Sequence, residues 1–101
     1  LICRTEEGGA QLHARLKRRG VDVHLITGGN VEYRGGVSVL PVHLSKGLEF
    51  DAVLLPDAEA ALYTASPRDA RLLYVGCTRA LHKLAILYLE SPSPLLPPDT
   101  V

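Results

Sequence analysis

Short aliphatic runs alternate with helix-forming segments along this chain, and that alternation is the strongest constraint on its fold. The β-branched and aliphatic runs predict five strands. They cover residues 1–5, 21–27, 37–42, 50–56 and 84–90. Two helices are predicted between them, over residues 6–19 and about 67–82. Strands that alternate with helices indicate an α/β domain with a largely parallel sheet covered on both faces.

The ends of the predicted helices carry recognisable signals. Gly20 ends the first helix after a basic last turn, which suits the negative end of the helix dipole. Ser66 is a suitable N-cap for the second helix, and Pro67 fits its first position. The second helix is expected to bury one apolar stripe and to carry Arg79 on an adjacent face. That stripe consists of Leu73, Cys77, Ala80, Leu81 and Leu84.

Two segments do not follow the alternation. Glycines at 28–29 and 35–36 predict turns or a small hairpin around residues 31–33. Residues 91–101 hold four of the seven prolines, so we expect a tail that does not pack as helix or sheet. The folded unit is therefore expected to span residues 1–90.

Composition bounds the function. A chain of 101 residues is the usual length of a single domain. Its 11 basic and 11 acidic residues give no net charge, which excludes a strong overall electrostatic attraction to nucleic acid or to an anionic membrane. Cys3 and Cys77 lie in apolar segments without metal-ligand spacing, which is typical of reduced core cysteines in a cytoplasmic protein. The four scattered histidines predict no metal site, and no apolar run is long enough for a membrane span. The start without Met, directly in a strand, suggests a piece of a larger protein.

Residues 43–49 and Arg79 are the candidates for chemistry, since ligands of open α/β sheets bind at the carboxyl ends of strands. Lys46-Gly47 lacks the upstream glycines of a phosphate-binding loop, so it reads as a turn with a solvated lysine. Glu49 stands where the pattern favours an apolar residue; it could hold sugar hydroxyls, or serve as an N-cap or ion-pair partner. Arg79 could be a surface arginine, or could stabilise a transferring phosphoryl group across a domain cleft.

Two stretches, VSVLPVHLSKGLEFDAVLL and DARLLYVGCTRALHKLAILY, resemble motifs V and VI of superfamily 1 helicases of the UvrD/Rep/PcrA type. The first 29 residues, LICRTEEGGAQLHARLKRRGVDVHLITGG, resemble the motif IVa segment of the same enzymes. The resemblance covers about residues 1–90. It implies a RecA-like three-layer domain, the second motor domain of an ATP-dependent DNA helicase or translocase, in which ATP lies between two RecA-like domains.

The resemblance also implies roles for individual residues. Arg79 would be the arginine finger on the γ-phosphate, and Glu49 would bind the ribose. Lys46 and Gly47 would lie in the turn facing the nucleotide, with the backbone at Gly47 near the γ-phosphate. His43 and Ser45 would face single-stranded DNA. The first RecA-like domain would supply the phosphate loop and the Mg²⁺ ligands, so this chain alone is not expected to hydrolyse ATP, and Arg4 receives no catalytic role.

The chain departs from the family pattern at two places. Pro41 stands where a threonine is usual, which removes a hydroxyl and a backbone donor. Only about nine residues, around 30–37, connect motif IVa to motif V, where UvrD-type enzymes insert a large accessory domain. This short connection, the form GCTRALHKL and the ending LESPSPLLP look most like the HelD group of ATPases. The resemblance to that group implies an alternative, in which the parent binds and recycles bacterial RNA polymerase.

Overall fold

The structure is a computed structural model and describes residues 1–28 and 36–96. Its elements in chain order are β1 (Ile2–Cys3), α1 (Glu6–Arg18), β2 (Val23–Leu25), β3 (Val37–Pro41), the 3-10 helix η1 (Val42–Leu44), β4 (Phe50–Leu55), α2 (Pro67–Cys77) and β5 (Ala80–Ile86). All pairings between these strands are parallel, which confirms the α/β prediction. The turns or hairpin predicted around residues 31–33 lie outside the described residues.

Helix α1 forms where the sequence predicts it. The Thr5 side chain caps it by accepting a hydrogen bond from the Gly8 N–H at 3.0 Å. Acidic residues occupy the first turn and basic residues the last, which complements the helix dipole at both ends. The chain leaves the helix through Gly20, whose φ of +83° is a conformation that glycine adopts without strain.

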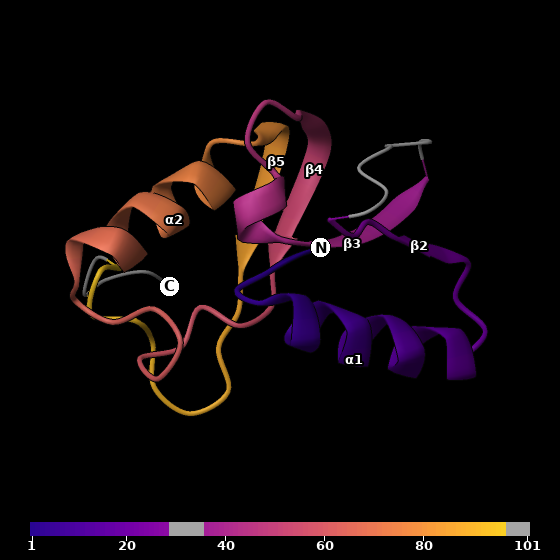
Figure 1. Cartoon of the computed structure of the whole chain (residues 1–101), viewed down its shortest axis with the longest axis horizontal. Coiled ribbons are helices and arrows are strands. Elements are labelled where there is room, and N and C mark those ends of the chain that lie inside the picture. Colours follow the sequence, from indigo (N-terminus) through magenta and orange to yellow (C-terminus); the bar gives the residue numbers. More distant parts are fainter. Residues whose placement is uncertain (29–35, 97–101) are drawn as a thin grey trace.

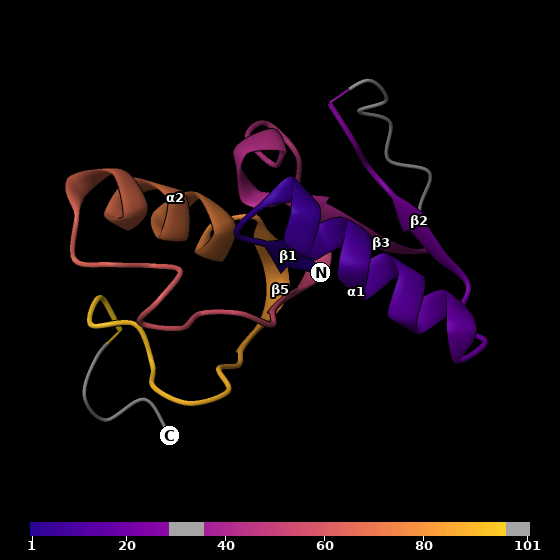
Figure 2. The ribbon, with the colours of Figure 1, turned by 60° about the horizontal axis from the view of Figure 1, so that its bottom comes forward.

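The strands form a three-stranded sheet in the order β1-β3-β2 and a two-stranded sheet of β4 and β5. Helix α2 lies beside β4 and β5 toward one end of the long axis, whereas α1 runs along β2 and β3 toward the other end (Figure 1), and the turned view in Figure 2 shows α1 next to β3. Helix α1 packs on the three-stranded sheet, where Leu12 and Leu16 cover a small core. The buried members of that core are Cys3, Val23 and Val39.

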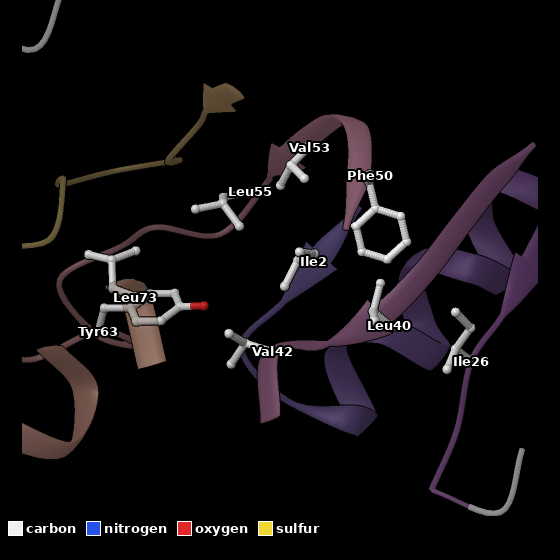
Figure 3. Packing of buried hydrophobic residues seen from close by; sticks show 9 residues of the cluster. All are labelled: Ile2, Ile26, Leu40, Val42, Phe50, Val53, Leu55, Tyr63 and Leu73. Carbon is white, nitrogen blue, oxygen red and sulfur yellow. The ribbon is translucent and has the colours of Figure 1, made fainter. Parts of the chain in front are cut away.

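A larger core joins both sheets to α2 (Figure 3). Its buried members are Ile2, Ile26, Leu40, Val42, Phe50, Val53, Leu55, Tyr63 and Leu73. At Gly76, α2 approaches β4 and η1 closely, because a Cβ there would lie 3.3 Å from Leu55 Cδ2 and 3.4 Å from Val42 Cγ2. Neither cysteine is bonded, and burial raises the pKa of the Cys3 thiol to about 12.

The predicted boundary between the second helix and the last strand is wrong. Helix α2 ends at Cys77, and β5 covers Ala80–Ile86 instead of 84–90. The reason is strand pairing, since Phe50 is in register with Ala80 and Leu55 with Ile86. The chain must therefore leave the helix early enough to reach the start of β4.

The proline-rich tail packs more than its composition predicts. Residues 91–96 form no helix, but Pro92 makes an isolated antiparallel bridge with Glu59. Ser93 is buried, and its hydroxyl donates a hydrogen bond to the carbonyl oxygen of Tyr63 at 2.7 Å. Leu95 and Leu96 pack against the larger core. This part of the tail therefore belongs to the folded unit.

One face of the strands carries a groove. A groove of about 1020 Å³ runs over β1, β3, β4 and β5, and no helix among the described residues closes it. Apolar groups such as Leu40, Leu54 and Leu84 line it. Residues 81–85 of β5 are all exposed. In residues 1–28 and 36–96, no helix is long and apolar enough to cross a membrane.

Candidate functional site

The turn between η1 and β4 is held by Ser45. This residue is fully buried, and its hydroxyl donates a hydrogen bond to the Val42 carbonyl oxygen at 2.7 Å, while its own carbonyl oxygen accepts one from the Leu48 N–H at 3.0 Å. The expectation that Ser45 faces single-stranded DNA is therefore wrong for this conformation, because its side chain stabilises the turn from inside.

The rest of this turn faces outward. Lys46, Gly47 and Glu49 are exposed, and Gly47 has a φ of +86°, which favours glycine. An added Cβ at Gly47 would meet no atom within 4 Å, so the packing does not explain a glycine there. The backbone at this point is open to a close approach from outside.

Glu49 stands between the half-buried Leu48 and the buried Phe50, with its carboxylate at the surface. Glu49 is neither an N-cap nor an ion-pair partner among the described residues. It precedes a strand, and it pairs with no other residue that the structure describes. A carboxylate carried by a strand terminus can accept two hydrogen bonds from neighbouring hydroxyls.

The sequence predicted that Arg79 lies within the second helix. In the structure, Arg79 instead follows the end of α2. Thr78 caps the helix, because its N–H and its hydroxyl both donate to the Tyr74 carbonyl oxygen, at 3.0 and 2.9 Å. Arg79 comes next and leads the chain into β5. The carbonyl oxygen of Arg79 accepts a hydrogen bond from the Phe50 N–H at 2.9 Å, which fixes the backbone of Arg79 beside the start of β4.

The guanidinium of Arg79 makes hydrogen bonds with only some of its N–H groups. Its Nη2 donates to the Thr78 hydroxyl at 3.2 Å. Its Nε is buried and has no acceptor in residues 1–28 and 36–96. A buried donor without a partner costs about 1–3 kcal/mol, and an anion could accept from Nε only after the side chain shifts to expose it. The guanidinium therefore keeps donors that the fold does not use.

The pairing of β4 with β5 brings these candidates together. Glu49 and Arg79 each come directly before the first paired residues, Phe50 and Ala80, so both lie at the amino ends of their strands. The Lys46 to Glu49 turn and Arg79 therefore precede β4 and β5, whereas the sequence analysis placed the candidates at carboxyl ends of strands. The physical reason is that η1 and α2 both lead the chain back to the start of a parallel strand.

His43 is the candidate that lies apart from this edge. It is exposed in η1, directly after β3, and its Nε2 lies 4.0 Å from Glu6 Oε1 at the start of α1. The same Glu6 oxygen accepts from the Gly28 N–H at 3.3 Å. Pro41 is buried at the end of β3, paired with Cys3, so it offers no surface there. His43 thus marks a separate surface near the carboxyl ends of β1, β2 and β3.

A polar cluster at the first turn of α2 was not predicted from the sequence. Asp69 accepts hydrogen bonds from the Thr64 hydroxyl at 2.7 Å and the Thr64 N–H at 2.9 Å, and it pairs with Arg4 Nη2 at 2.9 Å. The Thr64 hydrogen bonds are the main reason that the pKa of Asp69 is lowered to about 2, with the Arg4 guanidinium contributing further. The pattern Ser66-x-x-Asp69 at the helix start was the available sequence signal.

Within residues 1–28 and 36–96, the features to compare with this edge are the large groove and any group of metal-ligating side chains. The large groove over the sheet is lined by neither Arg79 nor Glu49 nor Gly47. Within the part of the chain that the structure describes, no group of three His, Cys, Asp or Glu side chains could hold a metal ion. The edge formed by Gly47, Glu49 and Arg79 can therefore recognise an anion and hydroxyl groups, and it would need another surface to enclose them.

Comparison with known proteins places the chain in a family. The model of the UvrD-like helicase C-terminal domain family matches residues 36–87, which include all the candidate site residues. A solved structure, the C-terminal domain of a possible DNA helicase from Lactobacillus plantarum, superposes with a TM-score of 0.81 at 39% identity. That superposition covers 93% of this chain and 57% of the other.

Curated relatives have a similar sequence identity to this chain over a shorter part of it. DNA helicase II of Rickettsia typhi is 36% identical over 58% of this chain, and DNA helicase II of Escherichia coli is 31% identical over 58% of it. The match spans 11% of the Rickettsia protein and 9% of the Escherichia coli protein. This chain thus spans about a tenth of the length of these relatives.

Proposed function

Because the chain belongs to the UvrD-like helicase C-terminal domain family, we propose that it is the second motor domain of an ATP-driven DNA helicase or translocase. In this proposal it supplies one wall of an ATP site, and a first RecA-like domain of the same parent protein supplies the other. Arg79 is the arginine finger, Glu49 is the ribose contact, and the turn at Lys46 and Gly47 lies next to the terminal phosphate.

The observation that carries the proposal is the shared edge of β4 and β5. The Phe50 N–H bonds to the Arg79 carbonyl oxygen at 2.9 Å, so the exposed Glu49 carboxylate and the partly unpaired Arg79 guanidinium start from neighbouring strands. A carboxylate for hydroxyl groups beside a cation for phosphate suits the two ends of a nucleoside triphosphate.

Each residue has a separate task in this scheme. Arg79 neutralises the charge that develops on the transferring γ-phosphoryl group. Glu49 accepts hydrogen bonds from the ribose hydroxyls and so orients the nucleotide. Gly47 lets the backbone approach because it carries no side chain on an open turn.

This chain forms half of the site. The described residues contain no glycine-rich loop that could wrap a triphosphate and no cluster of carboxylates for a metal ion. The Mg²⁺ that accompanies ATP neutralises phosphate charge when bound, and its ligands belong to the partner domain in this proposal. The chain alone is expected to show no ATP hydrolysis.

His43 is the proposed contact for single-stranded DNA. It is exposed on the surface near the ends of β1, β2 and β3, away from the Glu49 and Arg79 edge, so nucleotide and nucleic acid occupy different surfaces. An imidazole can stack on a base or donate to a backbone phosphate. Ser45, buried behind it, acts only by holding the turn.

The test uses the full-length parent protein. We expect its ATP hydrolysis to rise when single-stranded DNA is added, and we expect it to displace a strand from a partial duplex. The relatives are DNA helicases by name, so the polymerase-recycling alternative depends on three sequence features alone: the short connection, the GCTRALHKL form and the ending LESPSPLLP. ATP hydrolysis indifferent to DNA, together with retention of RNA polymerase in a pull-down, would contradict the helicase proposal.

A further inference from the structure

Arg4 is a partly buried cation whose contacts reach three parts of the fold. Its backbone N–H donates to Asp57 Oδ2 at 3.0 Å, just beyond β4. Its Nε donates to the Leu62 carbonyl oxygen at 3.2 Å, and its guanidinium lies 5.8 Å from the centre of the Tyr63 ring. Its side chain is 18% exposed. Arg4 therefore fixes the end of β1 to the loop that precedes α2.

The contact with Asp69 extends this link into α2 itself. Arg4 Nη2 lies 2.9 Å from Asp69 Oδ1, and the other carboxylate oxygen accepts both hydrogen bonds from Thr64. The Asp69 N–H in turn donates to the Ser66 hydroxyl at 3.1 Å. Asp69 thus belongs to the first turn of the helix and to the Arg4 cluster at once, so Arg4 ties that first turn to the end of β1.

Helix α2 connects this cluster to the proposed ATP edge. It has 11 residues, so it is about 16 Å long, and Arg79 comes two residues after its last one. The close packing of Gly76 on Leu55 and Val42 holds the far end at one point. Between these two ends, Leu73 is buried in the larger core, and beyond the helix the Phe50 N–H holds the Arg79 carbonyl oxygen, so the Asp69 cluster adds one further fixed point to α2 and to the residues that follow it.

We propose that Arg4 is a positioning residue for Arg79, acting through Asp69 and the rigid helix α2. The inference rests on the proposed function, because it assumes that Arg79 acts in ATP hydrolysis. Arg4 itself touches no nucleotide in this scheme. Misplacing a reacting group by about 1 Å can cost roughly a hundredfold in rate, so a small tilt of α2 is enough to matter.

The test compares variants of the full-length parent in ATP hydrolysis stimulated by single-stranded DNA. Arg4→Met keeps the length of the side chain and removes its charge and hydrogen bonds. We expect kcat to fall about tenfold or more, with the KM for ATP within about twofold, because the first domain holds most of the nucleotide. Arg4→Lys should recover part of kcat. Arg68→Met, an exposed arginine of the same helix, is the matched control and should leave kcat unchanged.

A double variant separates positioning from general stability. In an Arg79→Ala background, Arg4→Met should lower kcat no further, because the residue it positions is already gone. Circular dichroism first establishes a temperature at which each variant is folded. If Arg4→Met does not fold, Asp69→Asn takes its place, since it weakens the same link and keeps the shape of the side chain.

The outcomes distinguish this inference from the proposed function. A folded Arg4→Met parent with normal kcat, alongside a large loss in Arg79→Ala, would overturn the inference and leave the proposed function intact. An equal loss of kcat from Arg4→Met with and without Arg79 would also overturn it, because the effect would not pass through Arg79. Normal turnover by Arg79→Ala would remove the proposed function and this inference with it.

Discussion

The backbone N–H of Phe50 donates a hydrogen bond to the carbonyl oxygen of Arg79 at 2.9 Å, and through it two distant motifs share one edge. Glu49 comes directly before Phe50, and Arg79 directly before Ala80, the residue paired with Phe50. A carboxylate and a guanidinium that are 30 positions apart in sequence are thus placed on neighbouring strands. The predictions for Glu49, Gly47 and Arg79 depend on this placement.

Glu49→Gln is expected to weaken nucleotide binding by the full-length parent. The change keeps the size of the side chain but removes the charge that strengthens hydrogen bonds to hydroxyl groups. We expect the Kd for an ATP analogue to rise about tenfold, which corresponds to roughly 1.4 kcal/mol. Asp51→Asn is the matched control, because Asp51 is an exposed carboxylate two residues further along β4. An unchanged Kd for Glu49→Gln would contradict the ribose contact.

Gly47→Ala is expected to lower both stability and ATP hydrolysis, for different reasons. The φ of +86° makes alanine unfavourable by about 1 kcal/mol, although the Cβ meets no atom of the fold. Gly20→Ala has the same cost, since its φ is +83° and its surroundings are also open. Thermal unfolding should therefore shift similarly for both. Only Gly47→Ala should reduce hydrolysis by the folded parent; an equal effect of both variants would argue against a phosphate beside Gly47.

His43→Ala is expected to weaken the binding of single-stranded DNA by about fivefold, corresponding to roughly 1 kcal/mol for one lost contact. His82→Ala is a close control, because each histidine is exposed and lies 4.0 Å from one carboxylate, Glu6 or Asp51. Fluorescence anisotropy with a labelled oligonucleotide measures both variants of the parent at one salt concentration. Equal affinities of the two variants would exclude the proposed contact at His43.

Asp69 predicts a specific pH dependence of stability. Its pKa is lowered to about 2 in the fold, below the ordinary value of a free aspartate, so its contribution is present above about pH 4 and is lost as pH falls toward 2. Asp69→Asn lacks this contribution at every pH. The difference in Tm between the 101-residue chain and its Asp69→Asn variant should therefore shrink between pH 4 and pH 2. A constant difference over that range would show that the Asp69 carboxylate is not held as described.

Asp57, the second carboxylate near Arg4, should act in the opposite sense. Burial raises its pKa, since the charged form loses hydration that the Arg4 N–H replaces only in part. A carboxyl group with a raised pKa contributes less to stability as pH rises through its titration range. Comparison with Asp69→Asn, and not the chain's total acid dependence, is therefore what isolates Asp69.

Local signals in the sequence were sufficient for some of the fold. Helix α1 follows the prediction because its glycine stop and charged ends act over a few residues. The start of α2 follows it too, with Ser66 as the N-cap and Pro67 in the first turn. The approximate positions of β1 to β4 were also predicted, since buried parallel strands are continuous aliphatic runs.

Other features depend on contacts between distant residues, which a local pattern does not contain. The residues after Cys77 fit a helical stripe, but pairing with β4 makes them a strand. Ser45 and His43 belong to the same motif, and only the backbone of the turn decides that one is buried and the other exposed. The Arg4 cluster joins residues 65 positions apart, so no spacing rule could indicate it.

The change Arg79→Ala tests the central claim most directly. Among residues 1–28 and 36–96, the Arg79 side chain makes one hydrogen bond, to Thr78, so its removal should leave the fold intact. In the full-length parent, we expect kcat for ATP hydrolysis stimulated by single-stranded DNA to fall by about 10³-fold or more, with the KM for ATP little changed. A folded variant that hydrolyses ATP at close to the normal rate would contradict the assignment of Arg79 as the arginine finger.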